Sequence, residues 1–167
     1  GNLSVLENVC LPLQEFSGLP SELCETIARV KLGQVSLLDR ADTMPSELSG
    51  GQKKRAAIAR AMALDPPILF LDEPSAGLDP ITSASLDTLI QHLSREFGIT
   101  VVIISHELAS IEAIADRAIY LDRNAGGVLD QGTPNYLREE SPHAVIRNFF
   151  NRRAETPAVP AIKGVSV

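Results

Sequence analysis

Two short apolar segments separated by a helical pattern constrain the fold of this 167-residue chain most strongly. Residues 68–71 read Ile-Leu-Phe-Leu, and residues 100–104 are β-branched throughout, so both predict buried strands. Between them, apolar residues recur at helical spacing from Pro80 until Gly98, a residue placed to end the helix. A strand, a helix and a second strand in this order predict parallel strands joined by a right-handed crossover. We therefore expect an α/β fold.

Polar residues of chemical interest follow both predicted strands. Asp72 and Glu73 follow the first strand, and Ser105 and His106 follow the second. Ligands of open α/β sheets bind at the carboxyl ends of the strands, where these residues would meet. A carboxylate there can hold Mg²⁺, usually through water, while its neighbour orients an attacking water. The alternative interpretation is a solvated strand end, with His106 an ordinary surface histidine.

A second candidate site precedes a predicted helix over residues 53–64. Ser49, Gly50 and Gly51 open this helix, so a hydroxyl, bare backbone N–H groups and the helix dipole could together bind an anion. The alternative is an ordinary serine N-cap followed by two flexible glycines. Asp79 before a proline is likewise typical of a helix N-cap.

The rest of the chain gives weaker signals. Leu23, Ile27 and Val30 lie at helical spacing, whereas residues 1–17 give no firm prediction. The basic run of residues 53–55 is most simply a solvated helix face. The further expected elements are a helix from Pro20 to about Lys31, a helix after Ser105, a hairpin of residues 118–122 and 127–131, and helices at 134–140 and 142–150.

Four motifs appear together in one order, and together they are highly specific. They are Leu48–Gln52 (LSGGQ), Ile68–Glu73 (ILFLDE), Ala76–Asp79 (AGLD) and the strand that ends before His106. In these motifs the chain resembles the ATP-binding cassette (ABC) ATPases over about residues 1–150. The resemblance implies an α/β P-loop NTPase (RecA-like) fold with an incomplete parallel-sheet core and an α-helical subdomain.

The resemblance also implies a division of the chain into three parts. Residues 1–48 would form a partial helical subdomain and the linker to the signature motif. Residues 49–150 would form the C-terminal part of the RecA-like core. Residues 151–167 lie beyond the resemblance, and Pro157, Pro160 and Gly164 indicate a disordered tail.

The resemblance assigns roles in ATP hydrolysis to three residues. Asp72 would help to position Mg²⁺, Glu73 would polarise the water that attacks the γ-phosphate, and His106 would contact that phosphate. Catalysis of this kind depends on positioning and electrostatics more than on covalent chemistry.

Other residues would act between two ATPase subunits arranged head to tail. Ser49, Gly50 and Gly51 would contact the ATP held by the second subunit. Gln52 would orient the signature loop, and Asp79 would communicate across the dimer interface. Each of these roles is implied by the resemblance alone.

One expected motif is absent from the sequence. No Gly-x-x-x-x-Gly-Lys-Ser/Thr occurs, because none of the lysines follows a glycine. The glutamine of the Q-loop should precede residues 3–9, and it is absent as well. We therefore expect the C-terminal part of a longer ATPase, with ATP hydrolysis by the intact protein and little or none by this chain.

The missing part has a structural consequence. The absent Walker A strand would lie between the strands at residues 100–104 and 118–122 in the family's sheet. Its absence would leave two apolar strand edges unpaired, and such edges recruit other chains. We expect a closed gap, an intermolecularly paired or swapped dimer, or poor solubility.

The segments LSVLENVCLPL and SAGLDPITSASLDTLI resemble the ATPases of Mla/Mce-type (toluene-tolerance) lipid transporters. This resemblance implies transport of lipid or resistance to organic solvents. It also implies a membrane permease that docks on residues 9–45, and a cytoplasmic location on the inner face of the plasma membrane through that permease. The alternative is a non-transport ABC ATPase that acts on DNA or ribosomes.

Composition bears on the alternatives. Counts of 15 Lys and Arg against 21 Asp and Glu give a net charge of −6, which disfavours nucleic acid as a partner. No apolar run approaches the ~20 residues needed to span a bilayer, so direct membrane insertion is not expected. Cys10 and Cys24, which form no CxxC motif, are expected to be small core residues in a reducing compartment.

Overall fold

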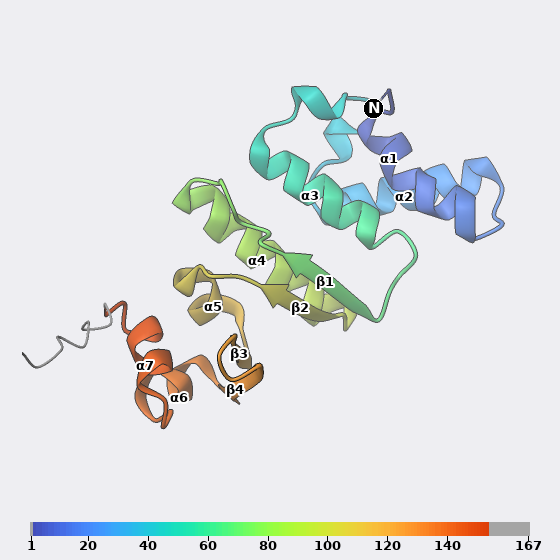
Figure 1. Cartoon of the computed structure of the whole chain (residues 1–167). Helices are drawn as coiled ribbons and strands as arrows, with labels where there is room; N and C mark the ends of the chain where they lie inside the picture. The colour runs from blue at the N-terminus through green and yellow to red at the C-terminus, as the bar shows by residue number, and fades with distance from the viewer. Residues whose placement is uncertain (1, 154–167) are drawn as a thin grey trace, which may run out of the picture. The chain divides into compact units, whose positions relative to one another are not determined.

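The computed structural model describes residues 2–153 of the chain (Figure 1). The helices and strands divide between two compact units, Gly1–Ile114 and Ala115–Val167. The division expected at residue 48, between a helical subdomain and a catalytic core, stays a prediction. Most of the tail expected at the carboxyl end, residues 154–167, lies outside the described residues.

The first unit contains several helices and a pair of parallel strands. Ile68 of β1 lies opposite Thr100 of β2, and Asp72 lies opposite Ile104. This pairing confirms the strand–helix–strand arrangement. The elements in order are α1 (Val5–Phe16), α2 (Ser21–Gln34), the 3₁₀ turns η1 (Leu38–Arg40) and η2 (Pro45–Glu47), α3 (Gly50–Ala61), β1 (Ile68–Asp72), α4 (Pro80–Phe97), β2 (Thr100–Ile104) and α5 (Leu108–Ile114).

The second unit contains a hairpin and two short helices. Strands β3 (Ala118–Asp122) and β4 (Gly127–Gly132) pair in antiparallel fashion, which confirms the predicted hairpin. Helices α6 (Pro134–Glu139) and α7 (Ala144–Phe150) follow.

Local signals set several helix ends. Asp79 caps α4, and Gly98 ends it in the left-handed region at φ 63°. Ser4 and Glu7 form a capping box at the start of α1, with Oγ of Ser4 accepting from the N–H of Glu7. This helix was not predicted from the sequence, and it carries Pro12 in its interior.

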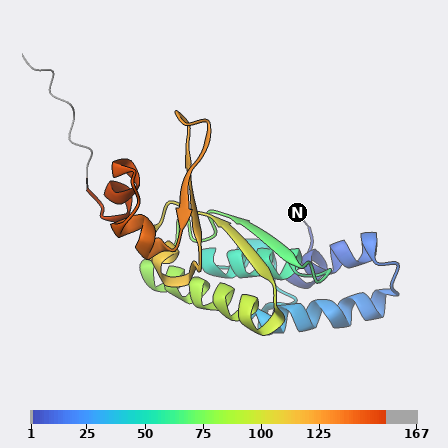
Figure 2. The ribbon, with the colours of Figure 1, turned by 90° about the horizontal axis from the view of Figure 1, so that it is seen from below.

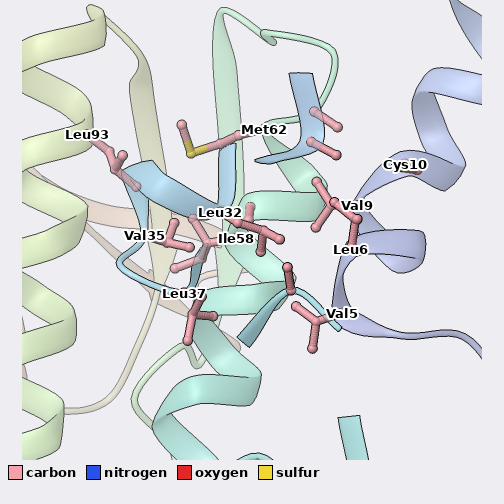
Figure 3. Packing of buried hydrophobic residues seen from close by; sticks show 14 of the residues in the cluster. Val5, Leu6, Val9, Cys10, Leu32, Val35, Leu37, Ile58, Met62 and Leu93 are labelled. Carbon is pink, nitrogen blue, oxygen red and sulfur yellow. The ribbon is translucent and has the colours of Figure 1, made fainter. Parts of the chain in front are cut away.

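The core of the first unit packs α1, α2, α3 and α4 together, and it also includes one face of the strand pair (Figure 3). In α2 the buried apolar residues are Cys24, Ala28 and Leu32. Leu23 and Val30, two of the residues whose spacing predicted this helix, lie instead on its outer side. The helix prediction is confirmed, but of the three residues that predicted it only Ile27 packs against the core.

The strands were expected to be buried, and this is wrong for one face of the pair. Successive side chains of a strand point to opposite faces, and here the helices cover one face. Leu69 is buried in the core of the first unit, whereas Phe70 is 72% exposed and Ile104 is 60% exposed. Figure 2 shows the strand pair running along α4. Within residues 2–153, β1 and β2 pair only with each other.

Two further expectations concern the thiols and the membrane. Cys10 and Cys24 are buried and free, as predicted, and burial raises the pKa of the Cys10 thiol. Across the described part of the chain, none of the helices combines the length and the apolar character that crossing a bilayer requires.

Candidate functional site

The polar residues that follow β1 and β2 meet at the carboxyl ends of the two strands. The N–H of Glu73 donates to the carbonyl of Ile104 at 2.8 Å, which continues the strand pairing one residue beyond Asp72. Nδ1 of His106 lies 2.7 Å from Oε1 of Glu73. The structure therefore brings the carboxylate and the imidazole together. This was expected, because neighbouring parallel strands have their carboxyl ends at the same edge of the sheet.

This pair has a distinct electrostatic character. The hydrogen bond to Glu73, with the attraction of its negative charge, raises the pKa of His106. The imidazole side chain is 74% exposed, so a bound group could reach it. Oε2 of Glu73 is buried and has no hydrogen-bond partner among the described residues. One carboxylate oxygen is thus engaged by His106, while the other is shielded from solvent.

The backbone of Glu73 is held in an uncommon conformation. Its φ of 45° lies in the left-handed region, which non-glycine residues seldom adopt. Its carbonyl accepts from the N–H of Ala76 at 3.2 Å and from Nζ of Lys54 at 3.1 Å. The interpretation of Lys54 as part of a solvated helix face is therefore wrong, because its ammonium group is committed to the Glu73 carbonyl.

Arg55, in the same basic run, also makes defined contacts. Its guanidinium donates to the carbonyl of Val35 at 3.2 Å and to Oγ of Ser85 at 2.8 Å. The basic run thus joins α3 to the segment that follows β1 and to α4. No local sequence signal identifies these contacts, since the partners lie far apart along the chain.

Asp72 ends β1 and is exposed. Over residues 2–153, no group of three or more His, Cys, Asp and Glu residues could hold a metal ion. Asp72 fits Mg²⁺ only as a single protein ligand. This is the usual arrangement when water and substrate phosphates supply the remaining oxygens.

The start of α3 is built by a capping box. Oγ of Ser49 accepts from the N–H of Gln52 at 3.3 Å, and Oε1 of Gln52 accepts from the N–H of Ser49 at 2.9 Å. The helix includes both Gly50 and Gly51, so the prediction that it begins after them is wrong. The N-cap interpretation of Ser49 is confirmed. The N–H groups of the first turn of a helix are suited to binding an anion, although that of Gln52 is already bonded to Ser49.

The turn at Asp79 packs against these glycines. Asp79 accepts from the N–H groups of Ile81 and Thr82, each at 3.0 Å, and from the Thr82 hydroxyl. The Thr82 hydroxyl is the main reason that the pKa of Asp79 is lowered. A Cβ at Gly51 would lie 2.5 Å from Cγ2 of Thr82, and one at Gly50 would lie 3.3 Å from Cδ2 of Leu78. Glycine is needed here because the two segments approach so closely.

The eight residues singled out from the sequence thus form two groups. Asp72, Glu73 and His106 gather at the strand ends. The second group, at the adjoining ends of α3 and α4, consists of Ser49, Gly50, Gly51, Gln52 and Asp79. Helix α3 links them, because Lys54 on this helix bonds the carbonyl of Glu73. Lys54 is the residue of this region that reasoning from the sequence missed.

Comparison with known proteins identifies similar sequences. Residues 2–76 match the family model described as "ABC transporter". The intermembrane phospholipid transport system ATP-binding protein MlaF of Escherichia coli (strain K12) is 39% identical over 157 residues, which are 93% of this chain and 57% of MlaF. The methionine import ATP-binding protein MetN of Rhodospirillum rubrum is 41% identical over 145 residues, which are 87% of this chain and 40% of MetN. The chain thus spans about half the length of these curated relatives.

Solved structures show the same likeness. CbiO1 from Clostridium perfringens, part of the ABC transporter complex CbiONQ, has a TM-score of 0.74 and 31% identity, covering 82% of this chain and 53% of its own. MJ0796, a bacterial ABC transporter cassette solved as a dimer, has a TM-score of 0.66 and 36% identity, covering 79% of this chain and 57% of its own.

Proposed function

The chain belongs to the family of ABC transporter ATPases and has their fold, and from this premise we propose that the whole protein hydrolyses ATP. The observation that carries the proposal is the Glu73–His106 pair at the ends of β1 and β2. The Glu73 side chain is 31% exposed beside His106, so an attacking water could reach the carboxylate. Glu73 and His106 would therefore face the phosphate that is transferred.

The chemistry proposed for this group follows from its geometry. Glu73 would accept a hydrogen bond and then the proton of the water, whose oxygen bonds the γ-phosphorus as the bond from that phosphorus to the bridging oxygen of ADP breaks. His106, which Glu73 orients, would donate a hydrogen bond to the phosphate oxygens as negative charge develops on them. Asp72 would hold Mg²⁺, which supplies charge neutralisation to the phosphates.

The group at the start of α3 would serve a second ATP. We propose that Ser49, Gly50 and Gly51 contact ATP held by a second subunit in a head-to-tail dimer, with the loop fixed by Gln52. Asp79 lies at this same surface, because its turn packs on the glycines. Support comes from the start of α3, where Ser49 and Gly50 are exposed and the N–H groups and the helix dipole favour an anion.

The transported class is a finer proposal. The similarity to MlaF, a protein of an intermembrane phospholipid transport system, supports lipid as the cargo and a membrane permease as the partner. The similarity to MetN, a methionine import protein, is also compatible with a cargo other than lipid. With a permease as partner, the protein would be a cytoplasmic subunit held on the inner face of the plasma membrane.

The 167-residue chain by itself should not turn over ATP. It has no Gly-x-x-x-x-Gly-Lys-Ser/Thr loop to cradle the phosphates, so both binding and positioning would be weak. Titration with Mg-ATP should show no binding in the micromolar range, and micromolar binding would refute this part of the proposal.

The hydrolytic role is tested by Glu73→Gln in the whole protein. The amide keeps the shape of the side chain but cannot accept the proton of the attacking water, so ATP should be retained while phosphate release is lost. Glu96→Gln is the matched control, because Glu96 is exposed on α4 and should leave turnover unchanged. Phosphate release at the wild-type rate by Glu73→Gln would rule out the assigned role.

A further inference from the structure

We propose that Lys54 is a positioning residue that sets the direction of the Glu73 carboxylate, and this rests on the proposed function of Glu73 in ATP hydrolysis. The ammonium group of Lys54 lies on α3, whereas Glu73 follows β1. The Lys54 Nζ to Glu73 carbonyl contact, at 3.1 Å, is a side-chain bond between two separate elements. Lys54 would act through the backbone of Glu73 and not on the substrate.

The backbone of Glu73 needs such a contact. Its φ of 45° is unfavourable for a residue with a Cβ, and a conformation of this kind persists only where its surroundings hold it. Three hydrogen bonds hold it. The N–H of Glu73 donates to the carbonyl of Ile104, and the carbonyl of Glu73 accepts from the N–H of Ala76 and from Nζ of Lys54. Two of them lie within the strand end and its turn, and the third comes from the helix.

The direction of the carboxylate depends on this backbone. With the backbone fixed, Oε1 reaches His106 at 2.7 Å, and Oε2 takes the position where it is buried and unpartnered among the described residues. A rotation about φ of Glu73 would move both oxygens together. Because a shift of about 1 Å in a reacting group can slow a reaction roughly 100-fold, a bond that removes this freedom matters for catalysis.

Lysine suits this task. Lys54 is half-buried, so its stem packs along the protein while its ammonium group reaches the carbonyl. A charged donor makes a stronger hydrogen bond than a neutral one. The two neighbours of Lys54 in the basic run differ from it, since Lys53 is exposed and Arg55 bonds Val35 and Ser85.

Three variants of the helix separate positioning from folding. Lys54→Met keeps the length and the apolar stem but removes the donor, whereas Lys54→Arg keeps a charged donor. Lys53→Met is the control for loss of a lysine from the same helix. Residue-resolved hydrogen exchange on the 167-residue chain should be faster at the amides of Glu73 and Ala76 in Lys54→Met alone.

Steady-state hydrolysis by the whole protein provides the second measurement. Lys54→Met should lower kcat by about 10- to 100-fold with KM for ATP unchanged, and Lys54→Arg should restore most of kcat. A general loss of structure would not lower kcat while leaving KM unchanged, and Lys54→Arg would not restore kcat. Wild-type exchange at both amides, or wild-type kcat in Lys54→Met, would overturn the proposal.

The same set of variants distinguishes the two proposals. If Glu73→Gln leaves hydrolysis intact, the proposed function fails, and with it the catalytic meaning of Lys54. If Glu73→Gln abolishes hydrolysis but Lys54→Met does not lower kcat, the proposed function stands and the positioning role is refuted.

Discussion

Gly51 offers a direct test of how α3 and α4 fit together. A Cβ at this position would lie 2.5 Å from Cγ2 of Thr82, whereas carbon atoms in contact normally lie about 3.5–4.0 Å apart. Relief would require a shift of roughly 1 Å or more. Thr82 cannot turn away freely, because its hydroxyl and N–H both bond Asp79. We therefore expect Gly51→Ala to lower the free energy of unfolding.

The change in the free energy of unfolding caused by Gly51→Ala is the balance of two opposing effects. Overpacking of a well-filled site costs about 1–3 kcal/mol. Replacing glycine by alanine inside a helix gains about 0.5–1 kcal/mol. Gly33→Ala is the control that measures this gain in stability without overpacking. Gly33 lies in α2, and a Cβ there would meet nothing within 4 Å. Gly51→Ala should therefore be about 1–3 kcal/mol less stable than Gly33→Ala.

A double-mutant cycle identifies the cause. Thr82→Ser removes the crowding methyl and keeps the hydroxyl that bonds Asp79. In that background Gly51→Ala should cost nothing or should stabilise the protein, giving a coupling of about 1–3 kcal/mol. Urea unfolding followed by far-ultraviolet circular dichroism measures it, with equal m values required in all variants. Equal destabilisation by Gly51→Ala in both backgrounds would refute the reasoning.

Three other predictions concern the site, the core and the open face of the sheet. Glu73→Gln should lower the pKa of His106 towards its ordinary value of 6.5, measured by NMR titration of the ring. In the unmodified chain, the stability that this pair contributes is present below pH 6.5 and is lost as the pH rises through the raised pKa of His106. The same pH dependence of the free energy of unfolding in Glu73→Gln would contradict this. Leu32→Ala should cost about 2–5 kcal/mol in urea unfolding because Leu32 is 0% exposed, and Val30→Ala, at 55% exposed, should stay within about 0.5 kcal/mol. Phe70→Thr should reduce concentration-dependent light scattering without changing the unfolding midpoint, and undiminished scattering would show that this face does not recruit other copies.

The sequence was a good guide where local chemistry decides the structure. Pro80 and Gly98 bounded α4 correctly, and the β-branched run of β2 was assigned to the residues that form it. The meeting of Glu73 and His106 followed from topology alone, because parallel strands bring their carboxyl ends together. These features depend on residues close together in the chain or on a general rule of connection.

The sequence was a poor guide where the partner lies far away. Leu23 and Val30 have the spacing of a core stripe, but Cys24 and Leu32 face the core because α1 and α3 pack on that side. Spacing identifies a helix without saying which apolar side another element will cover. Lys54 was misread for the same reason, since a basic helix position gives no sign of a carbonyl that lies beyond the next strand.

The conformation of Glu73 has a consequence for how this protein can change over evolutionary time. At φ 45°, glycine would fit the backbone better than any residue with a Cβ, so Glu73→Gly is a change that selection for stability alone would favour. The same change would delete the carboxylate beside His106. A library screened only for resistance to heat should therefore enrich inactive variants at this position, whereas one screened for growth should retain glutamate.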